Sequence, residues 1–315
     1  MIEIARYRAE DKEAWNNFID IARQATFLFN RNYMDYHASR FNDCSFVVKQ
    51  KKRIIAVFPA NRVGEILYSH QGLTYGGLLT SKTIGVERVA QILDELSIYL
   101  KRIGVNRIIY KAIPWIYHTI PSQEDLYILT NQYNVKLLSR NISSAFPLIG
   151  RQYFSQSRRW RLRKAKANAI FVDESNDLST FWKILSDNLK SRFGATPVHS
   201  LEEIERLKNA FPKLIKLYMA VETDSGQALG GTIIFETQQV IHTQYISATE
   251  KGKEVGAIDL IFDKLINSVY KDRGGYFDFG TSATNGGKDL NKGLINQKES
   301  YGGRAVCYDI YDWKL

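Results

Sequence analysis

One order of elements is predicted twice along this chain: three strands, a helix and a further strand. The predicted helix begins at Gly85 in the first half and at Gly256 in the second, and the strand after it begins at Val105 and Gly275. The two offsets, 256 − 85 = 171 and 275 − 105 = 170 residues, are nearly equal. A near-constant offset indicates two copies of one α/β unit, although a common element order can also recur by chance.

Apolar periodicity supports both predicted helices, because apolar residues recur every three or four positions from Val86 to Leu100 and from Ile258 to Val269. The chain has 315 residues, 44% of them hydrophobic, which suffices for two cores. A boundary near Ile149 separates the two copies. We therefore predict two domains, residues 1–148 and 149–315.

Composition narrows the class of protein. No apolar run approaches the roughly 18 residues of a membrane helix, so we expect no transmembrane segment. Cys44 and Cys307 have no CxxC spacing, which argues against disulfides and a metal site and favours the cytoplasm. A net charge of +10 suggests an anionic partner, such as a phosphorylated small molecule, a nucleic acid or the inner membrane face, which the protein would contact peripherally.

A basic run lies just after the predicted boundary. Six arginines or lysines fall within residues 158–166 around Trp160, and no acidic residue follows before Asp173. Such a run can hold the phosphates of a nucleotide, a lipid-linked precursor or RNA, and the tryptophan can stack on a base. The alternative is a solvated basic helix face at a domain junction.

The stretch from Tyr276 to Arg304 is rich in glycine and polar residues. It begins with a short strand that contains Asp278 and ends at Gly280, and a helix is predicted from about Leu290 to Lys298. A glycine-rich loop before a helix is suited to holding anions. An ordinary surface loop with a capped helix is the alternative.

Several segments, taken together, resemble the FemAB-like branch of the GNAT acyltransferases. This bacterial family implies an α/β fold of two tandem GNAT-like domains, with mixed central sheets flanked by helices, and transfer of an acyl or aminoacyl group to an amine. Its best-known relatives use aminoacyl-tRNA to extend the peptide of a peptidoglycan precursor. The segments are Gly72-Leu73-Thr74-Tyr75-Gly76-Gly77, Arg158 to Ala165, Thr196-Pro197-Val198-His199-Ser200, His242-Thr243-Gln244-Tyr245, Asp278-Phe279-Gly280, Leu290-Asn291 and Gln297-Lys298-Glu299.

The resemblance implies no permanently bound cofactor, but acyl-CoA or aminoacyl-tRNA as co-substrate. The loop that cradles the CoA pyrophosphate in related enzymes corresponds here to Lys253–Ile258, where a bulky isoleucine replaces the last small residue. Thr284 stands where the family leads us to expect a glutamate. These departures favour a donor other than a CoA thioester and remove one candidate acidic base.

Three residues are predicted to be catalytic. The resemblance assigns Lys298 to stabilising the oxyanion or a donor phosphate; the alternative is a solvated helix lysine. Asp278 would hold the incoming ammonium or orient a water, unless it is a buried structural carboxylate. His242 and Tyr245 lie on opposite faces of one strand, and we favour Tyr245, with Thr243 beside it, as facing the cleft.

Binding residues are predicted in both halves. Histidine is a poorer phosphate anchor than lysine, so His37 weakens the case for a nucleotide-linked acceptor, and a structural role is the alternative for both histidines. The predicted substrate-binding residues are His37, His70, Tyr75, Gly76, Gly77, Arg192, Ser282 and Asn291, and the predicted donor-binding residues are Lys253, Gly256, Arg159 and Arg163.

The sequence thus predicts a cytoplasmic N-acyltransferase that acts on an amine of a cell-envelope precursor, either peptidoglycan or a saccharide, with tRNA as one potential partner. The alternative is a non-catalytic binding protein built on degenerate GNAT domains that recognises an anionic nucleotide- or lipid-linked ligand. The polar density of the loop between Phe277 and Gly303 favours the enzyme.

Overall fold

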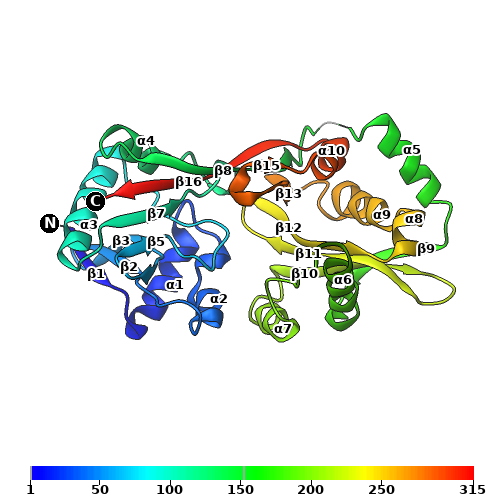
Figure 1. Ribbon diagram of the computed structural model, residues 1–315, viewed down its shortest axis with the longest axis horizontal. Coiled ribbons are helices and arrows are strands. Elements are labelled where there is room, and N and C mark those ends of the chain that lie inside the picture. The colour runs from blue at the N-terminus through cyan, green and yellow to red at the C-terminus, as the bar shows by residue number, and fades with distance from the viewer. Residues whose placement is uncertain (1, 152) are drawn as a thin grey trace. The chain divides into compact units, whose positions relative to one another are not determined.

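The computed structural model describes residues 2–151 and 153–315, and it confirms an α/β fold with mixed sheets flanked by helices (Figure 1). The chain forms two compact units. The first unit comprises residues 1–142, 283–289 and 306–315, and the second comprises residues 143–282 and 290–305.

The first unit contains two groups of strands. One group has the order β1-β2-β3-β6 and is antiparallel. The other has the order β4-β5-β7-β16, in which β5 and β7 are parallel because helix α3 connects them. The strands are β1 (Ile2–Arg6), β2 (Phe46–Gln50), β3 (Arg53–Phe58), β4 (Asn61–Val63), β5 (Ile66–Tyr68), β6 (Leu79–Thr80), β7 (Arg107–Lys111) and β16 (Arg304–Lys314).

The core of the first unit forms around α3, which buries Leu93, Leu96 and Leu100 at helical spacing. Phe46 and Trp313 pack into the same cluster. The helices of this unit are α1 (Lys12–Ile21), α2 (Arg31–Met34), α3 (Val86–Arg102) and α4 (Glu124–Asn131).

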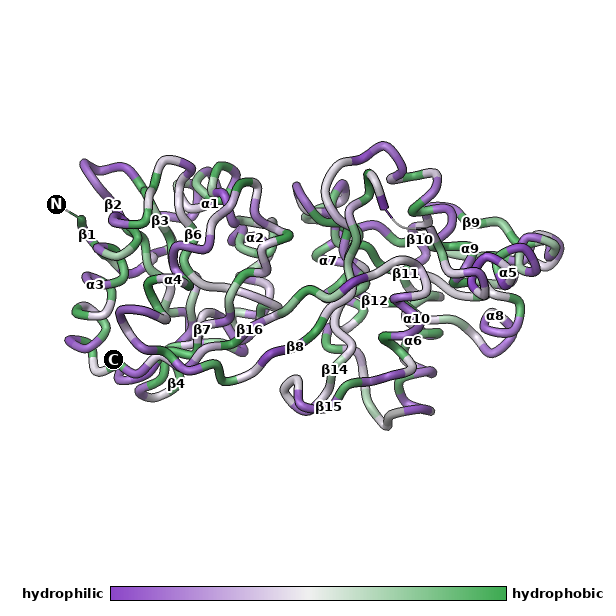
Figure 2. Tube along the Cα trace, turned by 90° about the horizontal axis from the view of Figure 1, so that it is seen from above, coloured by the Kyte–Doolittle hydropathy of each residue, from purple (hydrophilic) through white to green (hydrophobic). Residues whose placement is uncertain are grey.

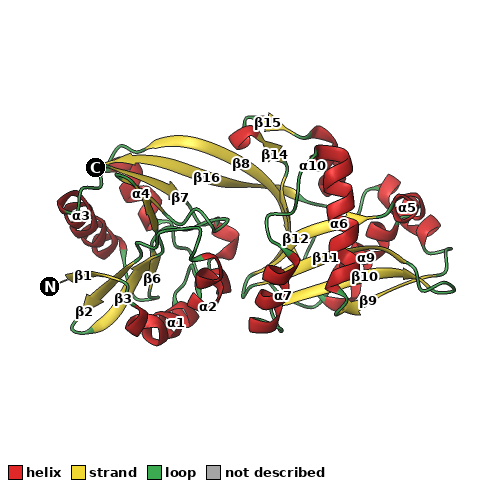
Figure 3. Ribbon diagram, turned by 60° about the horizontal axis from the view of Figure 1, so that its bottom comes forward, coloured by secondary structure: helices red, strands yellow, loops and turns green. Residues whose placement is uncertain are grey.

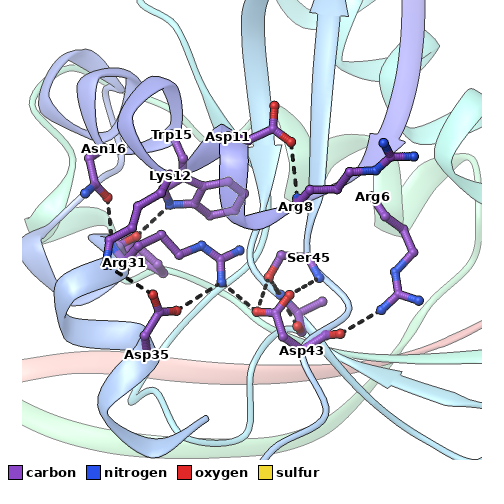
Figure 4. A network of polar contacts seen from close by, with 12 residues as sticks. Arg6, Arg8, Asp11, Lys12, Trp15, Asn16, Arg31, Asp35, Asp43 and Ser45 are labelled. Carbon is purple, nitrogen blue, oxygen red and sulfur yellow. Dashed lines mark hydrogen bonds and ion pairs between the residues drawn. The ribbon is translucent and has the colours of Figure 1, made fainter.

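A buried arginine ties α2 to the strands (Figure 4). Arg31 is 1% exposed, and its Nη1 lies 2.6 Å from the Asp43 carboxylate and 3.7 Å from that of Asp35. The guanidinium also lies over the ring of Tyr7, 3.4 Å from its centre. Burial of this cation is therefore offset by two carboxylates and an aromatic face.

The second unit has one run of strands in the order β8-β13-β12-β11-β10-β9. Strands β12 and β13 pair in parallel, and the other neighbours pair antiparallel. The strands are β8 (Lys136–Pro147), β9 (Ile170–Ser175), β10 (Ile215–Glu222), β11 (Ala228–Glu236), β12 (Val240–Ala248) and β13 (Tyr276–Thr281).

Helices cover both faces of this sheet (Figure 3). Tyr218 and Ala220 of β10 pack in one core with α9, whereas the residue between them, Met219, points to the face that carries Phe181 of α6. The helices are α5 (Gln156–Ala165), α6 (Leu178–Phe193), α7 (Leu201–Ala210), α8 (Glu250–Val255), α9 (Ala257–Lys264, continued by a π-helical turn over Leu265–Val269) and α10 (Lys292–Ser300).

The two units share one strand order. Strands β1-β2-β3 and β5-β7-β16 of the first correspond to β9-β10-β11 and β12-β13-β8 of the second. Helices α3 and α9 connect the parallel strands in each, and they begin after Gly85 and Gly256, as predicted. The last strand of each unit comes from the other half of the sequence, since β16 pairs with β7 and β8 with β13. This exchange differs from the predicted division at residues 148 and 149.

Candidate active site

A cavity of about 470 Å³ opens in the second unit where β12 and β13 separate. Their parallel pairing ends at His242 and Asp278, although β12 continues to Ala248 and β13 to Thr281. The cavity is lined mainly by apolar residues of α6, β12, α9, β13 and α10 and by Tyr301, which follows α10. These are Leu185, Leu189, Ile246, Ala248, Ile258, Phe262, Phe279, Leu294 and Tyr301, together with the polar residues Asn188, Arg192, Ser247, Lys253, Asn291, Gln297 and Lys298.

Helix α10 brings Lys298 to the cavity. Asn291 caps the helix, because its Oδ1 accepts a hydrogen bond from Leu294 N at 3.0 Å, and the helix then buries Ile295 and Lys298 one turn apart. The Lys298 Nζ donates to Gly280 O and Thr281 O, both at 2.8 Å. Both carbonyls follow the last residue of β13 that pairs with β12, so the lysine binds backbone that lies beyond the β12–β13 ladder.

The Lys298 ammonium is buried in a largely apolar environment. The side chain is 5% exposed, and burial lowers its pKa from 10.5 to about 8, while the negative charge of Asp278 opposes that shift. At pH 7 the group is thus an ammonium with three N–H bonds. Two of them serve the carbonyls, and the third is available to a ligand in the cavity that Lys298 lines.

Asp278 stabilises the end of β13 through hydrogen bonds. Its carboxylate is fully buried and accepts hydrogen bonds from Ser143 Oγ and, at 3.1 Å, from Gly280 N. The other carboxylate oxygen lies 2.9 Å from His242 Nδ1. Asp278 does not line the cavity, so the geometry corresponds to the structural alternative, in which the carboxylate positions Gly280 and His242.

Several predicted binding residues do meet at this cavity. Arg192, Lys253 and Asn291 line it, and Lys253 Nζ donates to Asn188 Oδ1 at 3.0 Å and to Glu250. Ser282 is buried, and its carbonyl accepts a hydrogen bond from the amide of Asn291 at 2.9 Å. Arg192 and Lys253 therefore add positive charge to a pocket that already holds Lys298.

Tyr245 lies elsewhere. Its hydroxyl is 2.6 Å from His199 Nδ1, and its ring packs edge-on against Trp182 of α6, with 5.2 Å between the ring centres. Burial raises its pKa to about 12. Tyr245 does not line the cavity, whereas the next residue, Ile246, does.

The candidates of the first half all belong to the first unit. His37 and His70 are buried with their rings 5.1 Å apart, and burial, together with His37, lowers the pKa of His70 to about 3, so that it is neutral. A Cβ on Gly76 would lie 2.1 Å from Ser69 O. Local packing thus accounts for this glycine without a ligand.

Local structure also accounts for Gly77 and Tyr75 without a ligand. Gly77 has a φ of +107°, and a Cβ there would lie 2.5 Å from the hydroxyl of Tyr110. Tyr75 is buried, and its hydroxyl donates to Thr26 Oγ1 at 3.3 Å. Backbone conformation and packing therefore explain this segment of the first unit.

The basic run forms α5, and most of this helix is hydrophilic (Figure 2). Arg158, predicted to bind anions with its neighbours, is buried and pairs with Asp259 of α9. Its spacing to Leu162 and Ala165, four and seven residues on, places it on the packed face of the helix, and that signal was present in the sequence. Arg159 and Arg163 are exposed and do not line the cavity.

Sequence reasoning missed Asp259. This carboxylate lies in the first turn of α9, after Gly256, whose φ is +79°. It accepts hydrogen bonds from Arg158 and from the hydroxyl of Tyr301, and Arg161 Nε lies 3.7 Å away. Helix N-termini favour anions, and at the N-terminus of α9 the chain supplies the Asp259 carboxylate as that anion.

Comparison with solved structures shows that the chain has a fold similar to that of FemX and of tandem GNAT proteins. FemX matches with a TM-score of 0.73 at 12% identity, over 99% of this chain and 97% of its own. The C-terminal domain of a putative lysylphosphatidylglycerol synthetase from Agrobacterium fabrum gives 0.60 at 10% identity, over 96% and 91%.

A tandem GNAT protein from the clavulanic acid biosynthesis pathway matches with a TM-score of 0.51 at 10% identity, over 100% of this chain and 98% of its own. These likenesses confirm the predicted fold class, tandem GNAT-like domains with mixed sheets flanked by helices. No protein-family model matches the sequence, and a comparison with curated proteins finds no match.

Within residues 2–151 and 153–315, no helix has both the length and the apolarity needed to cross a membrane. The same residues contain no group of three or more histidines, cysteines or acidic residues placed to bind a metal ion.

Proposed function

We propose that this protein is an N-acyltransferase that binds the acyl or aminoacyl group of its donor in the cavity of the second unit. One observation carries the proposal: Lys298, a buried lysine whose ammonium is held by two backbone carbonyls, lines an otherwise largely apolar cavity. Apolar pockets with few polar groups are typical ligand sites. The FemAB-like fold supports the reaction class.

The reaction needs little beyond positioning and one donor of hydrogen bonds. The nitrogen of a neutral amine attacks the acyl carbonyl carbon, the bond to the donor oxygen or sulfur breaks, and the proton of the amine leaves with that group or with solvent. Lys298 donates its third N–H to the carbonyl oxygen as negative charge develops there. Its two bonds to Gly280 and Thr281 fix the ammonium beforehand, so little reorganisation is required.

The acceptor we propose is an amine on a cell-envelope precursor. The proposal is supported by the likeness to FemX and to a putative lysylphosphatidylglycerol synthetase. A donor other than a CoA thioester is favoured, because the Asp259 carboxylate occupies the first turn of α9, where a pyrophosphate would otherwise bind.

The function is tested by incubating the purified protein with amine acceptors and three donor classes: acetyl-CoA, longer acyl-CoAs and aminoacyl-tRNA. Mass spectrometry then identifies any new amide. We expect an amide with one donor class, and a rate lower by roughly 100-fold in Lys298→Met, as when one preorganised donor is removed from an oxyanion site. Ligand binding without amide formation in every combination would favour the non-catalytic binding protein instead.

A further inference from the structure

We infer that the cavity of the second unit selects an apolar acyl chain that carries no ammonium, and so excludes aminoacyl groups in their protonated form. This inference rests on the proposed function and names the substrate class of the same site. It depends on the charges around the cavity and on the character of its walls.

Cationic side chains line the cavity and carboxylates do not. Lys298 and Arg192 contribute positive charge, Lys253 is paired with Glu250 outside the lining, and none of the described residues that line the cavity is an aspartate or glutamate. An α-ammonium placed there would face like charges in surroundings of low dielectric, where repulsion is strong.

Three carboxylates that adjoin or contact lining residues are engaged outside the cavity. Asp278 has no exposed surface and accepts hydrogen bonds from Ser143 and Gly280, with His242 beside it. Glu250 pairs with Lys253 and keeps 79% of its side chain in solvent. A third carboxylate, Asp259, is held by Arg158 and Tyr301 and does not line this cavity. None of these groups is placed to receive the ammonium of an aminoacyl donor.

The walls suit an aliphatic chain. Leu185 and Leu189 of α6 face the cavity with Ile246 of β12 and Phe262 of α9, and Phe279 of β13 completes this apolar lining. An apolar chain is driven into such a site because its apolar surface is removed from water. The Lys298 ammonium then meets the polar end of the chain, where an acyl carbonyl oxygen would lie.

Calorimetry with simple probes tests this inference on the full-length protein. Octanoate carries an apolar chain and a carboxylate that stands in for the oxyanion, octanamide is its neutral counterpart, octylamine its cationic one, and leucinamide imitates an aminoacyl group. We expect octanoate and octanamide to bind at least about tenfold more tightly than octylamine and leucinamide. Saturated fatty acids from C4 to C12 then measure the length of chain that the cavity accepts.

Two variants locate the binding. Lys298→Met should weaken octanoate binding by at least about tenfold, because a charge-assisted hydrogen bond is lost, whereas Lys292→Met, exposed on the same helix, should not. Leu294→Trp fills the cavity from the side of α10 and should abolish binding even if Lys298→Met proves too unstable to measure.

Three results would overturn the inference: binding of octylamine or leucinamide as tight as that of octanoate, no binding of any fatty acid, or octanoate binding that neither Lys298→Met nor Leu294→Trp changes. The first would leave an aminoacyl-transferring enzyme in place, since leucinamide in the cavity is compatible with the proposed function. If none of the probes bound and Leu294→Trp left amide formation unaffected, the cavity itself would be excluded as the donor site.

Discussion

Replacing Lys298 by methionine should change how the stability of the protein depends on pH. Burial lowers the lysine pKa from 10.5 to about 8, and each pKa unit corresponds to about 1.4 kcal/mol. Folding the charged form therefore costs about 3 kcal/mol relative to the neutral form. This cost is fully present below pH 8, and it disappears as the pH rises to 10.5, because the unfolded chain binds the proton more tightly than the folded one.

The variant lacks this titration but also lacks two hydrogen bonds. Leaving the carbonyls of Gly280 and Thr281 without the ammonium costs about 1 to 3 kcal/mol each when they stay buried and unpaired. At pH 7 this loss is largely offset by removal of the buried charge. At pH 10.5 nothing offsets it, so the free energy of unfolding of Lys298→Met should fall behind that of the wild type by about 3 kcal/mol more than at pH 7.

Urea unfolding at pH 7, 8, 9, 10 and 10.5 measures this difference, with Lys292→Met as a matched control on the exposed side of α10. Lys111, whose pKa burial also lowers to about 8, is present in every variant and cancels in the comparison. Stability curves for Lys298→Met and the wild type that ran parallel over this range would refute the reasoning, because Lys298 would then not be a buried cation.

Four further variants test the supporting structure by urea unfolding. Asp278→Asn should lower the free energy of unfolding by about 3 kcal/mol, since the buried carboxylate binds three partners, and an unchanged value would exclude its structural role. Arg31→Met should cost about 1 to 3 kcal/mol by removing the charged hydrogen-bond partner of Asp43, and an unchanged stability would contradict this. Gly77→Ala should destabilise by more than about 1 kcal/mol, whereas Gly85→Ala, with open space around it, should not; equal effects would count against the packing argument.

Much of the fold could be predicted from the sequence, because local patterns determine it. Apolar periodicity reveals the repeated order of strands and helix. The glycines at the starts of α3 and α9 mark where the two helices begin. The exchange of β8 and β16 was not predictable in this way. A strand's partner is decided by long-range pairing that no local pattern records.

The site was predictable in part. Lys298, Arg192, Lys253 and Asn291 meet at the cavity, but the short polar helix that carries Lys298 suggested a solvated lysine as readily as a buried one. The burial of Lys298 depends on the separation of β12 from β13. That separation is a tertiary feature, which no local sequence pattern shows.

Tyr245 was predicted to face the cleft but does not line the cavity, for a related reason. Alternation along β12 indicates which residues share a face, but not which face a helix covers. Arg158 and Asp259 lie on two different helices, so their pairing appears only once α5 packs on α9.

The central claim is that the Lys298 ammonium stabilises the oxyanion of an acyl transfer, and a single-turnover rate measurement tests it most directly. Once a donor is identified, amide formation is followed by mass spectrometry in the wild type, Lys298→Met and Lys292→Met. The proposed mechanism predicts a rate about 100-fold lower in Lys298→Met and an unchanged rate in Lys292→Met. Equal rates in all three proteins, with Lys298→Met folded, would remove Lys298 from the mechanism.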